Sequence, residues 1–267
     1  MSGSTPYVFM MKNRIEEKQL WEEIHKESGY SSRIFSLLDS DLVLNKFRME
    51  LSRLVVESRP IRILIPGCGS NINLQKCCYN VFGDNAQIDA LDWSEEAIKL
   101  SAQQTAGLGL RITYINQSYY ELSIDDSTYD VIVLANAIVS ESESNNESAV
   151  KNLTRLLKPG GVLLGLFPSP FNMLDYSLTN PDAHHWICDG KVDVNKRQIH
   201  EDGDTTQRFF SPLELYMLLK RTGLYVKAFE LFFYDDETFA RQISELYHIP
   251  YNNEYCFWGY FINSIKH

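Results

Sequence analysis

The chain has 267 residues, of which 44% are hydrophobic and 22% are charged, as in a folded globular protein rather than a disordered one. The formal net charge of −10 argues against a broad nucleic-acid-binding face, because such faces neutralise phosphates with lysine and arginine. The longest apolar runs are far shorter than the roughly 20 residues that cross a bilayer. The N-terminus also lacks a basic flank followed by an apolar core. We therefore expect a cytoplasmic protein that acts neither on nucleic acid nor in a membrane.

The five cysteines are scattered along the chain and form no Cys-x-x-Cys pair. Such a pattern is typical of reduced thiols in an intracellular protein. It predicts neither a disulfide framework nor a metal site.

The N-terminal part of the chain is expected to be helical. Residues 1–12 show no clear periodicity and are expected to form a flexible arm. From Arg14 to about His25, apolar residues recur at helical spacing, and Gly29 is expected to end this helix. A second helical pattern runs from about Ser40 to Glu57. These helices either cover a binding site or simply cap the edge of a sheet.

A short apolar strand, residues 61–65, runs into Pro66 and a turn that contains Gly67 and Gly69. Proline cannot continue a central ladder, so the strand is expected to end there. Glycine permits a positive φ and lets a ligand approach the backbone. In an open α/β sheet, such a first strand and turn place a ligand beyond the carboxyl ends of the strands. The turn is therefore either a binding loop or a plain tight turn.

A second apolar strand ends at Asp92, which follows Gly69 by 23 positions. At this offset an acidic side chain can accept hydrogen bonds from ribose hydroxyls. Trp93 comes next and either stacks on an adenine ring or belongs to the core. Ser94 is expected to cap the following helix. A third strand then leads into a loop at residues 114–122.

The alternation of strands and helices continues further along the chain. Residues 128–138 form another buried strand, and a helix that ends at Lys158 is followed by Pro159, a glycine turn and a fifth strand. Residues 168–208 then interrupt the pattern, because a connection in an α/β unit usually takes only about 2–6 residues. We expect a functional insertion there, with a hairpin inside it at residues 188–204.

The regular pattern resumes with a helix that is capped by Ser211, begins at Pro212 and ends at Gly223. Residues 254–265 are expected to form the last strand. Over roughly residues 55–235 this ordered set of motifs resembles the class I S-adenosylmethionine-dependent methyltransferases. The resemblance implies a Rossmann-like, doubly wound α/β fold with a seven-stranded sheet. That sheet is mostly parallel, and its last strand is antiparallel and inserted between the fifth and sixth.

The resemblance also implies a division of the chain. Residues 1–54 are expected to form a helical lid or cap, and residues 55–267 the methyltransferase core. Within that core, the insertion at residues 168–208 follows the fifth strand and is expected to lie on the substrate side.

The cofactor implied by the resemblance is S-adenosylmethionine, with S-adenosylhomocysteine as its product and no metal. The family usually has an acid two places before the first glycine and often a third glycine, where this chain has Ile65 and Asn71. Cys68 is expected to be a packing residue rather than a nucleophile. Ser118 stands where the family has an acid that accepts from the adenine amino group, and a hydroxyl can accept as well. The residues expected at the cofactor are Gly67, Cys68, Gly69, Asn71, Asp92, Trp93, Ser118, Tyr119 and Ala135.

The reaction implied is methyl transfer to an O or N atom of a small-molecule acceptor. The alternatives are a protein or peptide acceptor, or a protein that uses S-adenosylmethionine for another reaction or only as a ligand. His184 and His185 are the candidates for a general base, if the acceptor has a proton to lose, and surface or pocket-lining histidines are the alternative. His25 and His200 are weaker candidates for the same role. The residues expected at the acceptor are Trp21, Asn136, Phe171, Tyr176 and Trp186.

Overall fold

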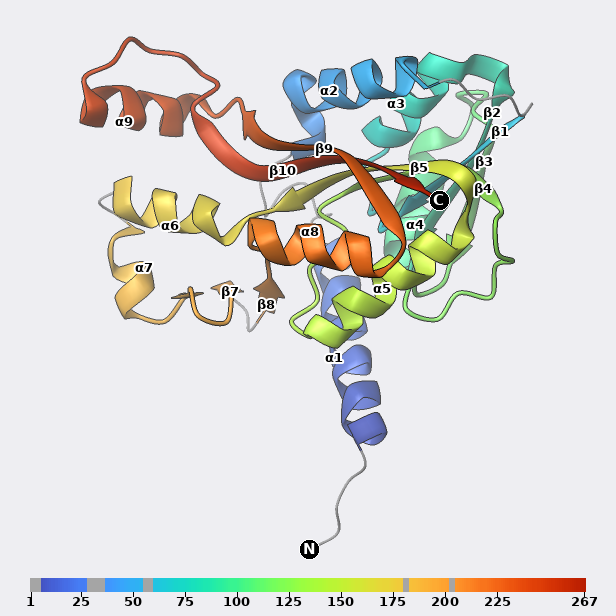
Figure 1. Cartoon of the computed structure of the whole chain (residues 1–267), viewed down its shortest axis with the longest axis horizontal. Coiled ribbons are helices and arrows are strands. Elements are labelled where there is room, and N and C mark those ends of the chain that lie inside the picture. Colours follow the sequence, from blue (N-terminus) through green and yellow to red (C-terminus); the bar gives the residue numbers. More distant parts are fainter. Residues whose placement is uncertain (1–5, 28–36, 55–59, 180–182, 202–204) are drawn as a thin grey trace, which may run out of the picture.

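The computed structural model describes residues 6–27, 37–54, 60–179, 183–201 and 205–267 (Figure 1). Its main sheet has seven strands in the order β3-β2-β1-β4-β5-β10-β9. The parallel strands are β1 (Ile61–Pro66), β2 (Ala86–Asp92), β3 (Ile112–Asn116), β4 (Tyr129–Ala135) and β5 (Leu157–Pro168). β10 (Cys256–Lys266) lies between β5 and β9 (Leu224–Tyr234) and is antiparallel to both. The predicted Rossmann-like doubly wound fold is therefore confirmed, including the position of the last strand.

Helices cover both faces of the main sheet (Figure 1). α2 (Asp41–Ser52) and α3 (Asn73–Phe82) pack on one face, and α5 (Glu143–Leu156) and α8 (Pro212–Arg221) pack on the other. Successive residues of a strand point to opposite faces. In β1, for example, Ile63 joins the cluster with α2 and α3, whereas Leu64 joins the cluster with α5 and α8. Because both faces are buried, the strands read as continuous apolar runs.

The first helix is longer than the sequence pattern indicated. α1 spans Pro6–Glu27, so the expectation of a flexible arm is wrong from Pro6 onward; residues 1–5 and Gly29 lie outside the described residues. Proline is favourable at the first helical position, where its missing N–H would have no partner. This preference can start a helix ahead of any apolar periodicity.

Two other helix ends differ from the expectation. Ser40 caps α2 as predicted, with Val43 N donating to its Oγ at 3.3 Å, but α2 ends at Ser52 rather than at Glu57, and residues 55–59 are outside the described residues. α5 ends at Leu156, and β5 begins directly at Leu157. Residues 158–161 are not a separate turn: they bulge out of β5, since Tyr129 pairs with Leu157 and Val131 already pairs with Val162.

The remaining caps agree with the sequence. Ser94 caps α4 (Glu95–Thr105), because its Oγ accepts from Ala97 N at 3.1 Å. At the start of α8, Pro212 is the first helical residue, and Glu214 accepts from the backbone N–H of Ser211 at 3.3 Å.

The chain leaves the main sheet between β5 and α8. This insertion holds α6 (Pro170–Thr179), α7 (His185–Cys188) and a small sheet of β6 (Val192–Asp193), β7 (Gln198–Glu201) and β8 (Thr205–Arg208). The expected hairpin is thus part of a three-stranded antiparallel sheet, because β8 adds to it. The buried Arg208 ties this sheet to the core through Glu143 at the start of α5 and Glu214 on α8.

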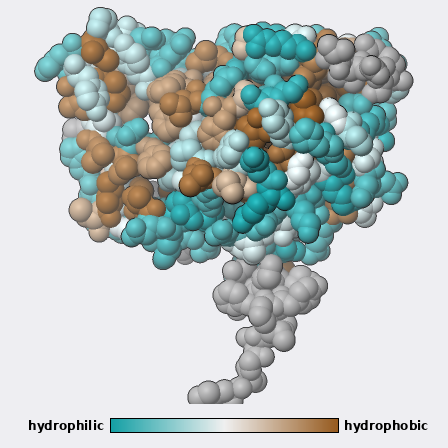
Figure 2. All heavy atoms as spheres, in the orientation of Figure 1, coloured by the Kyte–Doolittle hydropathy of each residue, from teal (hydrophilic) through white to brown (hydrophobic). Residues whose placement is uncertain are grey.

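A second addition, which was not predicted from the sequence, is α9 (Glu237–Tyr247) between β9 and β10. Figure 2 shows apolar side chains gathered over the part of the molecule where Figure 1 has α6 and α9. Leu178, Leu246 and Ile249 are among the exposed apolar residues there. Within the described part of the chain, no helix is both long enough and apolar enough to cross a membrane.

Candidate functional site

A cavity of about 60 Å³ lies at the carboxyl ends of β1, β2 and β4, between these strands and α1. The strand order reverses between β1 and β4, and open α/β sheets bind their ligands at such a point. The residues that line the cavity are Glu17, Trp21, His25, Gly67, Gly69, Asp92, Trp93, Tyr119, Ala135, Asn136, Ala137 and Val139.

The two glycines of the first turn serve different purposes. Both have a positive φ, +60° at Gly67 and +59° at Gly69, which a residue with a side chain adopts only with strain. A Cβ atom on Gly67 would lie 2.6 Å from the Cβ of Ala137, so this glycine lets two loops pack closely. A Cβ atom on Gly69 would meet only the His25 ring, 3.7 Å away. At Gly69 no side chain therefore covers the backbone on the side that faces α1.

Asp92 holds the turn and the next helix together from the end of β2. Its Oδ2 accepts from Gly69 N and its Oδ1 accepts from Ser94 N, both at 2.9 Å. Burial raises the pKa of Asp92 and lowers the pKa of the nearby His25, so the surroundings disfavour a charge on either group. A carboxylate has about four acceptor sites, so Asp92 could also accept from a ribose hydroxyl.

Aromatic rings form the wall next to Asp92. The Trp93 ring is stacked on the Tyr119 ring with centroids 6.4 Å apart and planes at 24°, and both rings line the cavity. Tyr120 packs edge-on against both. The Tyr119 hydroxyl donates to the carbonyl of Ala137, and burial raises its pKa, so it stays a neutral donor. Trp93 is thus a core residue and a cavity residue at once.

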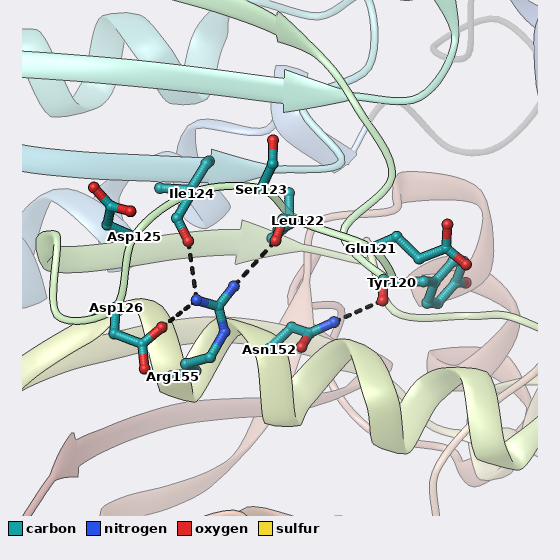
Figure 3. A pocket seen from close by; sticks show the side chains of 9 residues that line it. All are labelled: Tyr120, Glu121, Leu122, Ser123, Ile124, Asp125, Asp126, Asn152 and Arg155. Carbon is teal, nitrogen blue, oxygen red and sulfur yellow. Dashed lines mark hydrogen bonds and ion pairs between the residues drawn. The ribbon is translucent and has the colours of Figure 1, made fainter.

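The loop that carries these tyrosines is fixed from α5 (Figure 3). Asn152 Nδ2 donates to the carbonyls of Tyr119 and Tyr120, at 3.2 and 2.7 Å. The Arg155 guanidinium donates to the carbonyls of Leu122 and Ile124, at 3.2 and 2.9 Å. The residues that line the hollow in Figure 3 therefore hold this loop in position. Arg155 also forms an ion pair there with the Asp126 carboxylate.

One face of α1 closes the cavity. Glu17, Trp21 and His25 are spaced four residues apart, so they lie on the same side of the helix. A volume of about 60 Å³ holds about two water molecules, at roughly 30 Å³ each, whereas pockets for small ligands measure about 300–1,000 Å³. A nucleoside-sized ligand can therefore enter only if α1 or its side chains move.

Most of the predicted cofactor residues meet at this cavity: Gly67, Gly69, Asp92, Trp93, Tyr119 and Ala135 line it. The structure places Cys68, Asn71 and Ser118 outside the lining. Cys68 is packed in the core, where burial raises the pKa of its thiol. Asn71 donates to Asp39 Oδ1 at 2.9 Å, and Ser118 Oγ accepts from Tyr120 N at 3.2 Å.

The predicted acceptor residues divide in the same way. Trp21 and Asn136 line the cavity, whereas Phe171, Tyr176 and Trp186 do not. Phe171 is exposed, and Tyr176 packs against Trp186 and Phe239 with ring centroids 5.3 and 5.5 Å apart. The Tyr176 ring of α6 thus packs against α7 through Trp186 and against α9 through Phe239. The insertion reaches the cavity elsewhere.

That contact is made by the small sheet. Ile199 of β7 and Phe209, just after β8, cluster with the cavity residue Val139, and Trp21 packs against this cluster. Arg208 N also donates to Val139 O at 3.2 Å. The insertion therefore forms a wall beside the cavity, through residues that the sequence pattern did not single out.

The histidines proposed as bases lie at the surface. His184 and His185 are exposed and do not line the cavity. His184 Nε2 is 3.2 Å from the carbonyl of Leu178, and His185 Nε2 is 3.9 Å from Asp189 Oδ2. His200 is held by Thr206 at 2.9 Å. A role of His184 or His185 in proton removal stays a prediction, and their position lends it no support.

Sequence reasoning did not select Glu17 or Val139, and His25 entered only as a possible base. The four-residue spacing of Glu17, Trp21 and His25 could have revealed the helix face. Nothing in the sequence near Val139 indicates that the insertion returns to it. Within the residues that the structure describes, no group of three or more His, Cys, Asp or Glu side chains is arranged to hold a metal ion.

Residues 63–161 match the profile of a family described as "Methyltransferase domain". The matched segment contains the glycine turn, Asp92, Tyr119 and all of β4. Residues 63–161 therefore form a methyltransferase domain, and the fold is that of solved S-adenosylmethionine-dependent methyltransferases.

Two curated relatives are about a quarter identical to this chain over the segments that align. It is similar to the demethylmenaquinone methyltransferase of Bacillus cytotoxicus, with 26% identity over 159 residues, 58% of this chain and 66% of that protein. It is also similar to the tRNA N(3)-methylcytidine methyltransferase of Schizosaccharomyces pombe, with 25% identity over 177 residues, 59% of this chain and 57% of that protein. The chain therefore covers less than two thirds of the length of either relative: more than a third of the first and more than two fifths of the second stay unmatched.

The fold extends further than the sequence similarity does. A solved S-adenosylmethionine-dependent methyltransferase of Leishmania major is only 13% identical but matches 93% of this chain and 81% of its own, with a TM-score of 0.61. The N-terminal and C-terminal parts outside residues 63–161 therefore also have a counterpart in a known methyltransferase structure.

Proposed function

We propose that this protein is a methyltransferase that transfers the methyl group of S-adenosylmethionine to an O or N atom of a small molecule. The observation that carries the proposal is the cavity at the switch point, where the glycine turn, Asp92 and the stacked Trp93 meet under α1. The match of residues 63–161 to a methyltransferase domain supports the choice of cofactor. The small volume of the cavity, beneath α1, and the net charge of −10 support a small acceptor.

The residues present fit the cofactor. Asp92 offers oxygens for the ribose hydroxyls, Gly69 bares the backbone for the methionine part, and Trp93 and Tyr119 offer flat apolar rings for the adenine. When bound, the cofactor supplies an activated methyl group on a sulfonium. The protein's part is then to align the acceptor, exclude water and handle any proton that leaves the acceptor.

The proposal includes the division of the chain into a lid, residues 1–54, and a core, residues 55–267. α1 is helical and closed over the cavity, so entry of the cofactor requires an opening step. We expect hydrogen exchange in α1 to slow when S-adenosylhomocysteine is bound. Equal protection with and without it would favour a helix that merely caps the sheet.

A macromolecular acceptor is the second candidate, because one relative is named as a tRNA methyltransferase. The net charge of −10 disfavours it, since tRNA binding relies on basic residues. A peptide acceptor would need an open groove, whereas the cavity lies beneath α1.

Calorimetry with S-adenosylhomocysteine tests the proposal first: we expect saturable binding to one site, and no binding would contradict it. Transfer of labelled methyl from S-adenosylmethionine should then be compared on a small-metabolite extract, bulk tRNA and a protein extract. Label in the metabolites supports the small acceptor. Label confined to tRNA or protein would replace it with the second candidate.

A further inference from the structure

Two carboxyl groups, Asp92 and Glu17, line the cavity, and only Asp92 is explained by cofactor binding. Asp92 lies beside His25, whereas Glu17 is eight residues earlier on α1. Eight residues of α-helix span about 12 Å. Glu17 therefore lies toward the other end of the helix face, near the residues that follow β4 and contact the insertion.

Glu17 is held in place by a polar cluster at the start of α5. Ser140 Oγ accepts from Ser142 N at 3.3 Å and from Asn145 Nδ2 at 3.2 Å, so its single proton is left to donate to Glu17 Oε2 at 3.0 Å. Asn145 is fixed in turn, because its Oδ1 accepts from Arg14 Nε at 3.1 Å. The carboxyl group is thus oriented by a network rather than free in solvent.

Apolar side chains also lie beside this carboxyl group. Trp21 is one turn along the same helix, and Val139 precedes Ser140. Burial raises the pKa of Glu17 to about 7; Ser140 and Arg14 act against the rise and Glu141 adds to it. The hydroxyls of Tyr119 and Tyr120 stay neutral, because burial raises their pKa values. Near neutral pH the group can both take up and release a proton.

We propose that Glu17 is the general base of the reaction and that the acceptor is a small hydroxyl compound with a flat, largely apolar body. The apolar body suits Trp21 and the Val139 wall, and the hydroxyl group suits Glu17. The inference rests on the proposed methyltransferase function. It specifies the acceptor class and replaces the histidines as the residue that handles the proton.

The chemistry balances without a further reactant. The acceptor O–H bond breaks and its proton passes to the Glu17 carboxylate. The electron pair left on the oxygen forms the new bond to the methyl carbon, and the pair of the broken carbon–sulfur bond stays on sulfur. Glu17 returns its proton to water before the next turnover.

The first test does not depend on turnover. Carboxyl carbons of protein labelled with carbon-13 glutamate should show one resonance that titrates near pH 7 and disappears in Glu17→Gln. Glu23→Gln, which alters an exposed glutamate of the same helix, should retain it. Ser140→Ala should move the midpoint upward, because the carboxylate loses a hydrogen-bond donor. A Glu17 resonance that titrates at the ordinary value would overturn the proposal.

The second test uses labelled S-adenosylmethionine with matched panels of small phenols and small aryl amines, from pH 5.5 to 9. We expect transfer to phenols, with a rate that rises through about pH 7 and levels off. Glu17→Gln should lower this rate about 100-fold and remove the pH step, while Glu23→Gln behaves as wild type. Transfer only to amines, no transfer to any hydroxyl compound, or an unchanged profile in Glu17→Gln would each overturn the proposal.

S-adenosylhomocysteine affinity separates this proposal from the one on which it rests. Glu17→Gln should bind the product as wild type does, because Glu17 lies away from Asp92. If wild type does not bind it, the proposed function fails. If wild type and Glu17→Gln bind it equally but the rates are also equal, only the role of Glu17 fails.

Discussion

The two ends of the cavity are built from different kinds of contact. At the Asp92 end, a carboxylate at the tip of a strand accepts from backbone N–H groups of the adjacent turn and helix start. At the Glu17 end, side chains from α1 and from the start of α5 meet across 123 positions of sequence. The first end is therefore built on the sheet itself, whereas the second depends on α1 lying in its present position. Cofactor binding should depend mainly on the first end and acceptor chemistry on the second.

The largest effect should come from the first turn at the Asp92 end. Gly67→Ala should lower the free energy of unfolding by roughly 2–6 kcal/mol, the sum of backbone strain and overpacking of about 1–3 kcal/mol each. The reason is the positive φ together with the 2.6 Å approach to Ala137. Gly69→Ala has nearly the same φ, but its new Cβ atom would have its nearest neighbour at 3.7 Å. Its loss of stability should therefore come from backbone strain alone. Denaturant unfolding measures the stability of both variants. Equal losses of stability would mean that the structure around Ala137 can shift to accept the new Cβ atom at no cost.

At the other end, the stability effect should depend on pH. The folded protein holds the Glu17 proton up to about pH 7, whereas the unfolded chain releases it near 4.5, so wild type loses stability as pH rises through this window. Glu17→Gln has no such loss. Its stability relative to wild type should therefore increase by up to about 3 kcal/mol between pH 4.5 and 7.5, at 1.36 kcal/mol per pKa unit. A constant difference across these unfolding curves would show that the carboxylate is well solvated.

Asp92→Ala should weaken the binding of S-adenosylhomocysteine by about 1.5–3 kcal/mol, as expected for a lost charge-assisted hydrogen bond. The variant also frees the N–H groups of Gly69 and Ser94. Asp125→Ala removes the same charge from an exposed position and serves as the control in calorimetry. Unchanged affinity in Asp92→Ala would remove Asp92 from the site.

A substitution on α1 should have a smaller effect, and it should strengthen S-adenosylhomocysteine binding rather than weaken it. His25 lies over Gly69 and beside Asp92, where the proposed cofactor must bind. His25→Ala should therefore tighten S-adenosylhomocysteine binding, by roughly 1 kcal/mol or about fivefold, because the empty form, in which the His25 ring fills part of the site before α1 closes again over the ligand, competes less well. Lys26→Ala, an exposed neighbour, should leave the affinity unchanged. Weaker binding in His25→Ala would instead make the imidazole a direct contact of the cofactor.

The difference between the Asp92 end and the Glu17 end of the cavity also explains which features could be predicted from the sequence. The sheet, the glycine turn, Asp92 and Trp93 carry local signals, since a buried strand, a positive φ and an acid at a fixed offset are all visible within a few residues. Phe171 and Trp186 were assigned to the acceptor pocket from composition, but which side of an insertion faces a cavity depends on tertiary packing. Ile199 and Phe209 reach the site for the same reason. Glu17 is an intermediate case, because its spacing from Trp21 was visible but its partner Ser140 was not.

The position of β10 has a consequence for how the chain is made. β10 follows β9 in the chain but separates it from β5, and no other described strand neighbours β9 in the main sheet. Until β10 has been synthesised and has left the ribosome, the outer edge of β5 is unpaired. The strands that carry Gly67 and Asp92 can already be assembled by then. A nascent chain stalled in this interval should therefore display an open strand edge that chaperones can bind, next to an already formed glycine turn.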